Sequence, residues 1–199
     1  ELKNYTEAIA TLKQTKFLCL NERYRQIVLN LMGKSENPCQ LVGEAYDENR
    51  LLPIHIRAND RNAIFNVYFH KAILCYLFGN YKQAAEYITQ AKHYLGNAAG
   101  LLLVPLLNFY ESLIGLAAIT AEAGNDKPYF QQQRQKKRVL QQVKGNQQQL
   151  EHWAQYAPMN HLHKFYLVEA ERCRVQGKGL EASASYDRAI ALAEEHQYT

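Results

Sequence analysis

Gly33-Lys34-Ser35 come nearest in this sequence to residues arranged for phosphate binding. A phosphate-binding P-loop ends in these residue types, but it also needs a glycine five residues earlier and an apolar strand before it. Val28 occupies the position of that glycine, inside a helical pattern. We therefore interpret the segment as a helix C-terminus with a capping glycine, and we expect no nucleotide to bind there.

Three histidines raise two further kinds of chemistry. His161 and His163 suggest metal binding, but helical residues two apart point about 200° away from each other, so they cannot hold one ion together. His152, with Pro158 six residues on, is no better as a phosphoacceptor, because no acidic residue follows it directly. The sequence also lacks the glycine loop, His-Arg-Asp and Asp-Phe-Gly of protein kinases. We predict no catalytic residue, no cofactor and no metal site.

The candidate contact surface is a basic cluster, Arg134, Lys136, Lys137 and Arg138. These residues fall at the N-terminal end of a predicted helix, where the helix dipole disfavours positive charge, so we expect them to be solvated and to contribute nothing to stability. An acidic protein partner suits them better than nucleic acid, because only Tyr129 and Phe130 are close enough to stack on bases. A charge run on a solvated helix face remains the simplest interpretation.

Composition indicates an ordinary globular protein. Of the 199 residues, 47% are hydrophobic and 21% charged, with a net charge of +4. The four cysteines, Cys19, Cys39, Cys75 and Cys173, form no CxxC pair, which favours free thiols and a reducing cytoplasm. The first residues show neither a signal peptide nor an initiator Met, so we expect a segment of a larger protein.

Residues 101–121 are apolar enough to need a membrane check. They contain Pro105, Asn108, Glu111 and Ser112, and Lys/Arg clusters flank neither end. We interpret them as a buried core helix and expect no membrane contact.

Helical periodicity recurs along the chain, and strand-like alternation is hard to find. With only ten Gly and five Pro, long helices are favoured. Residues 34–58 contain Pro38, Gly43 and Pro53 and predict an irregular connector with one short helix. The predicted helices cover residues 4–17, 21–33, 60–78, 81–95, Pro105 to Gly124, 129–157, 161–176 and 180–197. The helix over 129–157 has a seam of Val139, Val143, Leu150, Trp153 and Ala157.

An internal repeat relates residues 79–91 to residues 177–189. Each has a Gly, an Ala five residues later, a large residue after four more, and an Ala three beyond that; these are Gly79, Ala84, Ile88 and Ala91, and Gly177, Ala182, Tyr186 and Ala189. A small residue, Ala72 or Ala170, lies seven residues before each Gly. The spacing predicts a helix ended by Gly and a second helix that approaches it closely at the Ala.

These residues resemble the tetratricopeptide repeat. The resemblance implies an all-α, tetratricopeptide-like fold of antiparallel helix pairs, stacked in an irregular right-handed superhelix. We expect one domain over residues 1–199, with an incomplete repeat at residues 1–17, where Tyr5, Ala8 and Leu12 match a second repeat helix, and the connector at 34–58.

A second resemblance covers roughly residues 40–195. Its segments are similar to a helical region of very large bacterial, notably cyanobacterial, signalling proteins, which combine serine/threonine kinase, AAA-type ATPase, GAF and histidine-kinase domains. They are Asn59-Asp60-Arg61, Tyr76 to Tyr81, Asn108 to Leu113, Trp153 to Asn160, and His163-Lys164 with Leu167 to Glu171. The resemblance implies that catalysis resides in other domains of a parent kinase.

Our leading hypothesis is a non-catalytic helical scaffold for protein partners or for neighbouring domains of the same polypeptide. The alternative is a module that binds a small-molecule effector and regulates an adjacent ATPase or kinase domain. An open groove would favour the scaffold, and a closed cavity with convergent polar groups would favour the effector. An independent enzyme is the third interpretation and has no residue set to support it.

Overall fold

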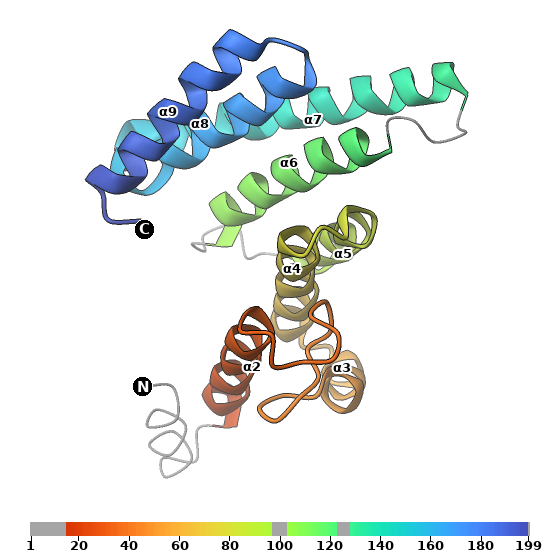
Figure 1. The fold of residues 1–199 in the computed structure, drawn as a ribbon. Coiled ribbons are helices and arrows are strands. Elements are labelled where there is room, and N and C mark those ends of the chain that lie inside the picture. The colour runs from red at the N-terminus through yellow and green to blue at the C-terminus, as the bar shows by residue number, and fades with distance from the viewer. Residues whose placement is uncertain (1–14, 97–102, 123–127, 199) are drawn as a thin grey trace. The chain divides into compact units, whose positions relative to one another are not determined.

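The computed structural model describes residues 15–96, 103–122 and 128–198, and within them it confirms the all-α prediction (Figure 1). Eight helices occupy these residues, whose only β feature is an isolated bridge between Val42 and Asp47. The structure divides into two compact units, Glu1–Ala99 and Gly100–Thr199. The expectation of one domain stays a prediction. The incomplete repeat proposed for residues 1–17 lies almost wholly outside the described residues.

Unit 1 contains α2 (Thr15–Leu31), α3 (Glu48–Arg57), α4 (Arg61–Leu77) and α5 (Tyr81–Tyr94). The central helix is α4, which contacts each of the other three. It is apolar on nearly every face, as a fully surrounded helix must be. One buried cluster joins it to the connector through Leu41, Tyr46, Val67 and Leu74.

The connector after α2 is held by two buried amide side chains rather than being loose. Gln26 Oε1 accepts hydrogen bonds from the backbone N–H groups of Ala45 and Tyr46. Asn30 Nδ2 donates to the carbonyl oxygens of Pro38 and Gln40, at 3.0 and 2.6 Å. The short helix expected within residues 34–58 is α3, which contains Pro53.

Unit 2 contains α6 (Leu103–Ala121), α7 (Tyr129–Tyr156), α8 (Pro158–Val175) and α9 (Gly179–Glu195). Helix α6 packs against α7 and α8, and α8 pairs with α9. By length and composition α6 could cross a membrane. Its Glu111 and Ser112 are buried, however, and both accept hydrogen bonds from Asn146 of α7, at 3.0 and 3.1 Å. These contacts agree with a core helix.

Helix α7 is continuous across Gly145, and its 28 residues measure about 42 Å at ~1.5 Å per residue. Its buried seam is Val143, Gln147, Leu150 and Ala154. Trp153, which we expected in the seam, is only half-buried. Gln147 takes a seam position because its Nε2 donates to the carbonyl of Phe165 at 3.1 Å.

Two predicted helix boundaries are wrong. Residues 15–31 form one helix, so Asn21 lies inside it and does not cap a new one. Helix α8 begins at Pro158 rather than at residue 161, because proline fits the first helical turn, where its missing N–H has no partner to lose. The turn before it is reduced to Ala157.

The two repeat segments fold into the same helix–turn–helix. Gly79 and Gly177 both have left-handed backbones, with φ of 78° and 75°. The residue after each glycine donates its N–H to a carbonyl five residues back, Asn80 to Cys75 and Lys178 to Cys173. This is the capping pattern in which a glycine ends a helix. The predicted role of the two glycines is confirmed.

Overpacking these pairs should destabilise the protein. Ala84 and Ala182 are buried, at 0% and 4% exposure, as are Ala72 and Ala170 on the preceding helices. Ala84→Leu and Ala182→Leu each add side-chain volume to a filled interface, so we expect each to cost about 1–3 kcal/mol. Urea unfolding measures the loss, with Ala85→Leu, at a partly exposed neighbour, as the control. Wild-type stability of both variants would contradict the shared packing.

Candidate functional site

An open apolar groove lies on unit 2. It has a volume of about 490 Å³ and is lined by residues of α6, α8 and α9 and by the segment after α9. Ile190 is 57% exposed there, whereas Ala189, next to it in the chain and also in the lining, belongs to the core. The lining residues are Leu106, Phe109, His163, Lys164, Leu167, Tyr186, Ala189, Ile190, Ala193 and Tyr198.

One end of the groove is positively charged. Lys164 donates to the carbonyl of Asn160 at 2.8 Å and contacts His163 Nε2 at 2.9 Å. Its ammonium also lies over the Tyr198 ring, 4.6 Å from the centroid. Because an ammonium only donates, Nε2 of His163 must accept, and the neutral ring carries its proton on Nδ1.

Burial, and after it the electrostatic effects of Lys164, His196 and His161, lower the pKa of His163 to about 4. Burial also lowers the pKa of Lys164. The causes of the lowered pKa of His163 include no carboxylate. A carboxylate placed at this end of the groove would meet a partly desolvated ammonium, where an ion pair is stronger than in water.

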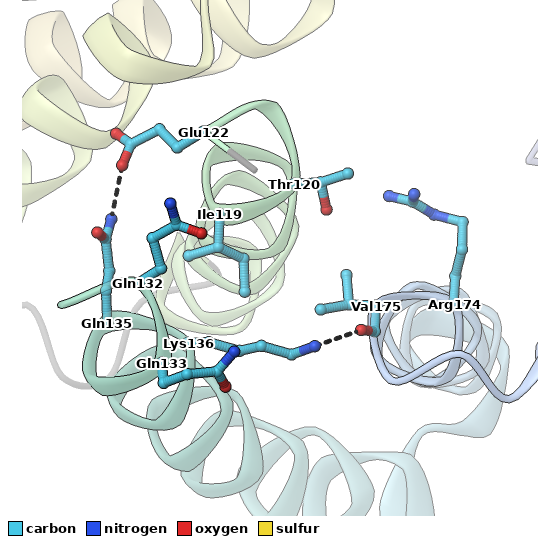
Figure 2. Close-up of a pocket in the computed structure, with 9 residues that line it drawn as sticks. All are labelled: Ile119, Thr120, Glu122, Gln132, Gln133, Gln135, Lys136, Arg174 and Val175. Atoms are coloured by element: carbon cyan, nitrogen blue, oxygen red, sulfur yellow. Dashed lines mark hydrogen bonds between the residues drawn. The ribbon is translucent and has the colours of Figure 1, made fainter. Parts of the chain in front are cut away.

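A second hollow, of about 260 Å³, lies between α6, α7 and α8 and is mainly polar (Figure 2). Lys136 Nζ crosses it to donate to the carbonyl of Val175, at 2.9 Å. On another wall, Gln135 Nε2 donates to Glu122 at 3.2 Å. Arg174, across the hollow in Figure 2, pairs with Glu171 at 2.7 Å, so its charge is already balanced.

The structure separates the four residues of the predicted basic cluster. Arg134, Lys137 and Arg138 are exposed, as expected. Lys136 is partly buried, so its predicted solvation is wrong. It lies on the packed side of α7, and its bond to Val175 satisfies a carbonyl at the C-terminal end of α8, where positive charge is stabilising.

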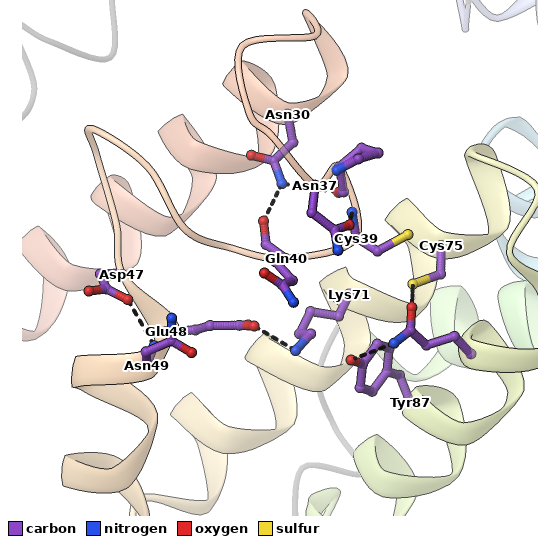
Figure 3. Close-up of polar contacts among 12 residues, drawn as sticks. Asn30, Asn37, Cys39, Gln40, Asp47, Glu48, Asn49, Lys71, Cys75 and Tyr87 are labelled. Atoms are coloured by element: carbon purple, nitrogen blue, oxygen red, sulfur yellow. Dashed lines mark hydrogen bonds and ion pairs between the residues drawn. The ribbon is translucent and has the colours of Figure 1, made fainter.

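Unit 1 contains a buried ion pair that the sequence interpretation missed (Figure 3). Lys71 Nζ of α4 lies 2.7 Å from Glu48 Oε1, at the first residue of α3, and both side chains are at least nine-tenths buried. The ammonium also lies over the Tyr87 ring of α5, 4.4 Å from the centroid. The pair therefore ties three helices together. Lys71 on an otherwise apolar helix face was the sequence signal that could have predicted this ion pair.

The residues considered for chemistry have structural roles. Gly33, with φ of 73°, follows the end of α2, and the N–H groups of Gly33 and Lys34 donate to Asn30 and Leu29. These groups are thus occupied and cannot cradle a phosphate. The hollow beside them, about 390 Å³, also includes the carboxylate-bearing Glu36.

The two neighbouring histidines of α8 turn to different partners. The His161 ring lies 6.2 Å from that of Trp153, and the His163 ring 4.4 Å from that of Tyr198. Within the described residues, no three His, Cys, Asp or Glu side chains lie close enough together to hold a metal ion.

Comparison with protein-family models, with curated proteins and with solved structures finds no match to this chain.

Proposed function

We propose that the chain is a non-catalytic, tetratricopeptide-like helical scaffold whose groove on α6, α8 and α9 receives a segment of a protein partner or of a neighbouring domain of the same polypeptide. The observation that carries the proposal is the open, apolar lining of this groove. Covering such a surface with an apolar segment is favourable, by about 25 cal/mol for each Å² of apolar surface that is buried.

The chemistry of the groove narrows the segment it receives. Ile190, Leu106 and Leu167 provide apolar contacts, so the segment must present apolar side chains. Lys164 contacts a carbonyl, an imidazole and an aromatic ring, and the causes of its lowered pKa include no carboxylate. We infer that the segment has an acidic residue or a chain-terminal carboxylate at this end.

Substitution at Ile190 tests the groove. Ile190→Glu places a charge among apolar contacts, and because Ile190 is 57% exposed the fold should tolerate it. A pull-down against the other domains of the polypeptide, followed by titration of the bound domain, should show affinity falling about tenfold or more, or roughly 1.4 kcal/mol.

The matched control is Leu180→Glu, also on α9 but 88% exposed and not part of the groove. It should bind as the wild type does. If both variants bind equally, or if no domain is retained by the wild type, the groove is not the contact surface.

The alternative function, an effector-binding module, is favoured by the polar hollow of Figure 2, where amide and charged groups converge. Thermal shift with a panel of small carboxylates, amino acids and nucleotides tests it. A true effector raises the melting temperature of the wild type but not of Gln133→Ala. Gln131→Ala, exposed on the same helix but outside the lining, is the control.

The wider setting is part of the proposal. We infer that the scaffold belongs to a cytoplasmic, multidomain signalling kinase with an ATPase domain, and that it couples those domains. The segments quoted above, from Asn59-Asp60-Arg61 to Leu167–Glu171, support this inference through their resemblance to such proteins.

A further inference from the structure

The first 22 residues of α7, 129–150, contain five cations and no acidic residue; Glu151 is the first acid of the helix. The cations are Arg134, Lys136, Lys137, Arg138 and Lys144. Helix geometry divides them. Lys136 shares the packed side with Val143 and Gln147, whereas Arg134 and Arg138 fall on the opposite side and Lys137 and Lys144 on one flank next to it, at spacings of three, four and six residues.

An exposed aromatic ring extends this charged side. Phe130 lies four residues before Arg134, one helical turn away on the same side, and its side chain is 74% exposed. We call the set formed by Phe130, Arg134, Lys137, Arg138 and Lys144 the basic ridge. All five are exposed.

The ridge does not stabilise the helix that carries it. Arg134 lies three residues from Lys137 and four from Arg138, and like charges at these spacings repel each other. Among the described ion pairs, none includes a ridge residue. Charge complementarity with a partner accounts for the ridge, whereas folding does not.

We propose that the basic ridge docks an acidic α-helix of a protein partner, with an apolar residue of that helix against Phe130. The ridge is separate from the groove, since α7 does not line it, so this contact goes beyond the proposed function. Its cations lie one helical turn apart (~5.4 Å, from Arg134 to Lys137 and Arg138) or two turns apart (from Lys137 to Lys144), spacings at which carboxylates recur on one face of a second helix.

The shape of the ridge argues against two other anionic partners. Single-stranded nucleic acid needs a groove and successive aromatic platforms, whereas this ridge is the convex side of one helix with one aromatic ring. A membrane-surface helix buries a continuous apolar face, and here the apolar face of α7 already packs within unit 2.

Fluorescence anisotropy with a synthetic probe tests the docking. The probe is a fluorescein-labelled helical peptide of Ala, Glu and one terminal Leu, with Glu at every third or fourth position, and the reference peptide has Gln for each Glu. We expect the full chain to bind the acidic peptide saturably and the Gln peptide at least about tenfold more weakly. Binding should fall steeply as salt rises, because exposed ion pairs are screened.

The ridge variant combines Arg134→Ala, Lys137→Ala, Arg138→Ala and Lys144→Ala. Removing these four cations lowers the net charge from +4 to 0. It should lose at least about tenfold in affinity. The matched control removes four exposed cations elsewhere, Lys34, Arg57, Lys82 and Arg188, and should retain binding. Phe130→Ser should weaken binding of the acidic peptide, and should leave unchanged the binding of a version of that peptide with Ala in place of the Leu.

A charge-reversed variant, Arg134→Glu with Lys137→Glu and Arg138→Glu, keeps the test decisive. It should bind a Lys version of the probe and lose the Glu version. Equal losses in the ridge and control variants would overturn the proposal, because net charge alone would then explain binding. Ridge-dependent binding of an oligothymidylate or of phosphatidylserine vesicles, without binding of the acidic peptide, would assign the ridge to another partner.

Discussion

Lys71→Met should lower the free energy of unfolding by about 3–5 kcal/mol, because it leaves the Glu48 carboxylate buried without its cation. Glu48 Oε1 has Lys71 as its partner at 2.7 Å, and Oε2 is buried with no hydrogen-bond partner. This loss is a large fraction of the free energy of unfolding of a typical domain, which is about 5–15 kcal/mol. Urea unfolding, read by hydrogen exchange of the α4 amides, measures it in unit 1.

Replacing both partners separates the ion pair from its burial. Glu48→Met with Lys71→Met removes both charges and retains the packing volume, so it should recover most of the stability lost by Lys71→Met alone. If the double variant is no more stable than the single one, the loss does not come from the unpaired carboxylate. Leu77→Met, at a 54% exposed position of α4, should leave stability unchanged.

High pH should have the same effect as the single substitution. Burial alone would lower the pKa of Lys71, but the hydrogen bond and charge of Glu48, together with Tyr87, raise it above its ordinary value of 10.5. The folded state thus holds this proton more tightly than the unfolded state. The stability from the pair is complete below pH 10.5 and is lost as pH rises through the folded pKa.

The local signals of the sequence were sufficient to predict the helix pairs. Gly79 and Gly177 end their helices because glycine adopts the left-handed backbone conformation without strain. Ala84 and Ala182 are small enough to be buried where the two helices of each pair approach closely. Both are decided within a few residues of the chain. Helix type and the closely packed pairs could therefore be predicted without the structure.

Burial across helices was harder to predict. Gln147 occupies a seam position only because the Phe165 carbonyl of another helix accepts its hydrogen bond. Lys136 can lie on the packed side of α7 because its ammonium donates a hydrogen bond to the carbonyl of Val175, 39 residues away. The helical period puts Lys136 and Gln147 in phase with Val143, but their polar residue types favour solvent. The sequence interpretation therefore places Trp153 in the seam and Lys136 among the solvated cations.

The groove could not be predicted from any one segment. Leu106 and Ile190, on α6 and α9, are separated by more than eighty residues of chain and come together only through α8. No pattern within one segment of the sequence predicts that these two residues line the same groove. The basic ridge is the opposite case: it lies on one helix, and its residues were visible in the sequence once the packed side of α7 was known.

Two separate surfaces on unit 2 suit a scaffold better than a single site would. In our proposal the groove selects apolar segments through Ile190 and Leu167, and the ridge selects acidic ones through Arg134, Lys137 and Arg138. Salt should weaken contacts at the ridge and leave the apolar contacts of the groove largely intact. Binding measured at two salt concentrations can therefore separate the two partners.

His70→Phe should remove the largest part of the acid sensitivity of unit 1. Burial, together with the positive charge of the buried Arg23, lowers the pKa of His70 to about 4. The unfolded state takes up the proton near pH 6.5 and the folded state only near pH 4. Wild-type stability should therefore fall by about 3 kcal/mol between these values, at ~1.36 kcal/mol per pH unit.

Phenylalanine can take the place of the imidazole because His70 already packs edge-on against the Tyr24 ring, 5.1 Å away. It cannot be protonated, so urea unfolding of His70→Phe at a series of pH values should show a shallower slope below pH 6.5. Part of the slope should remain, since burial also lowers the pKa of His55 in the same unit. His152→Phe, at an exposed histidine, is the control and should keep the wild-type slope. A full wild-type slope in His70→Phe would show that His70 is not the group that gains a proton on acid unfolding.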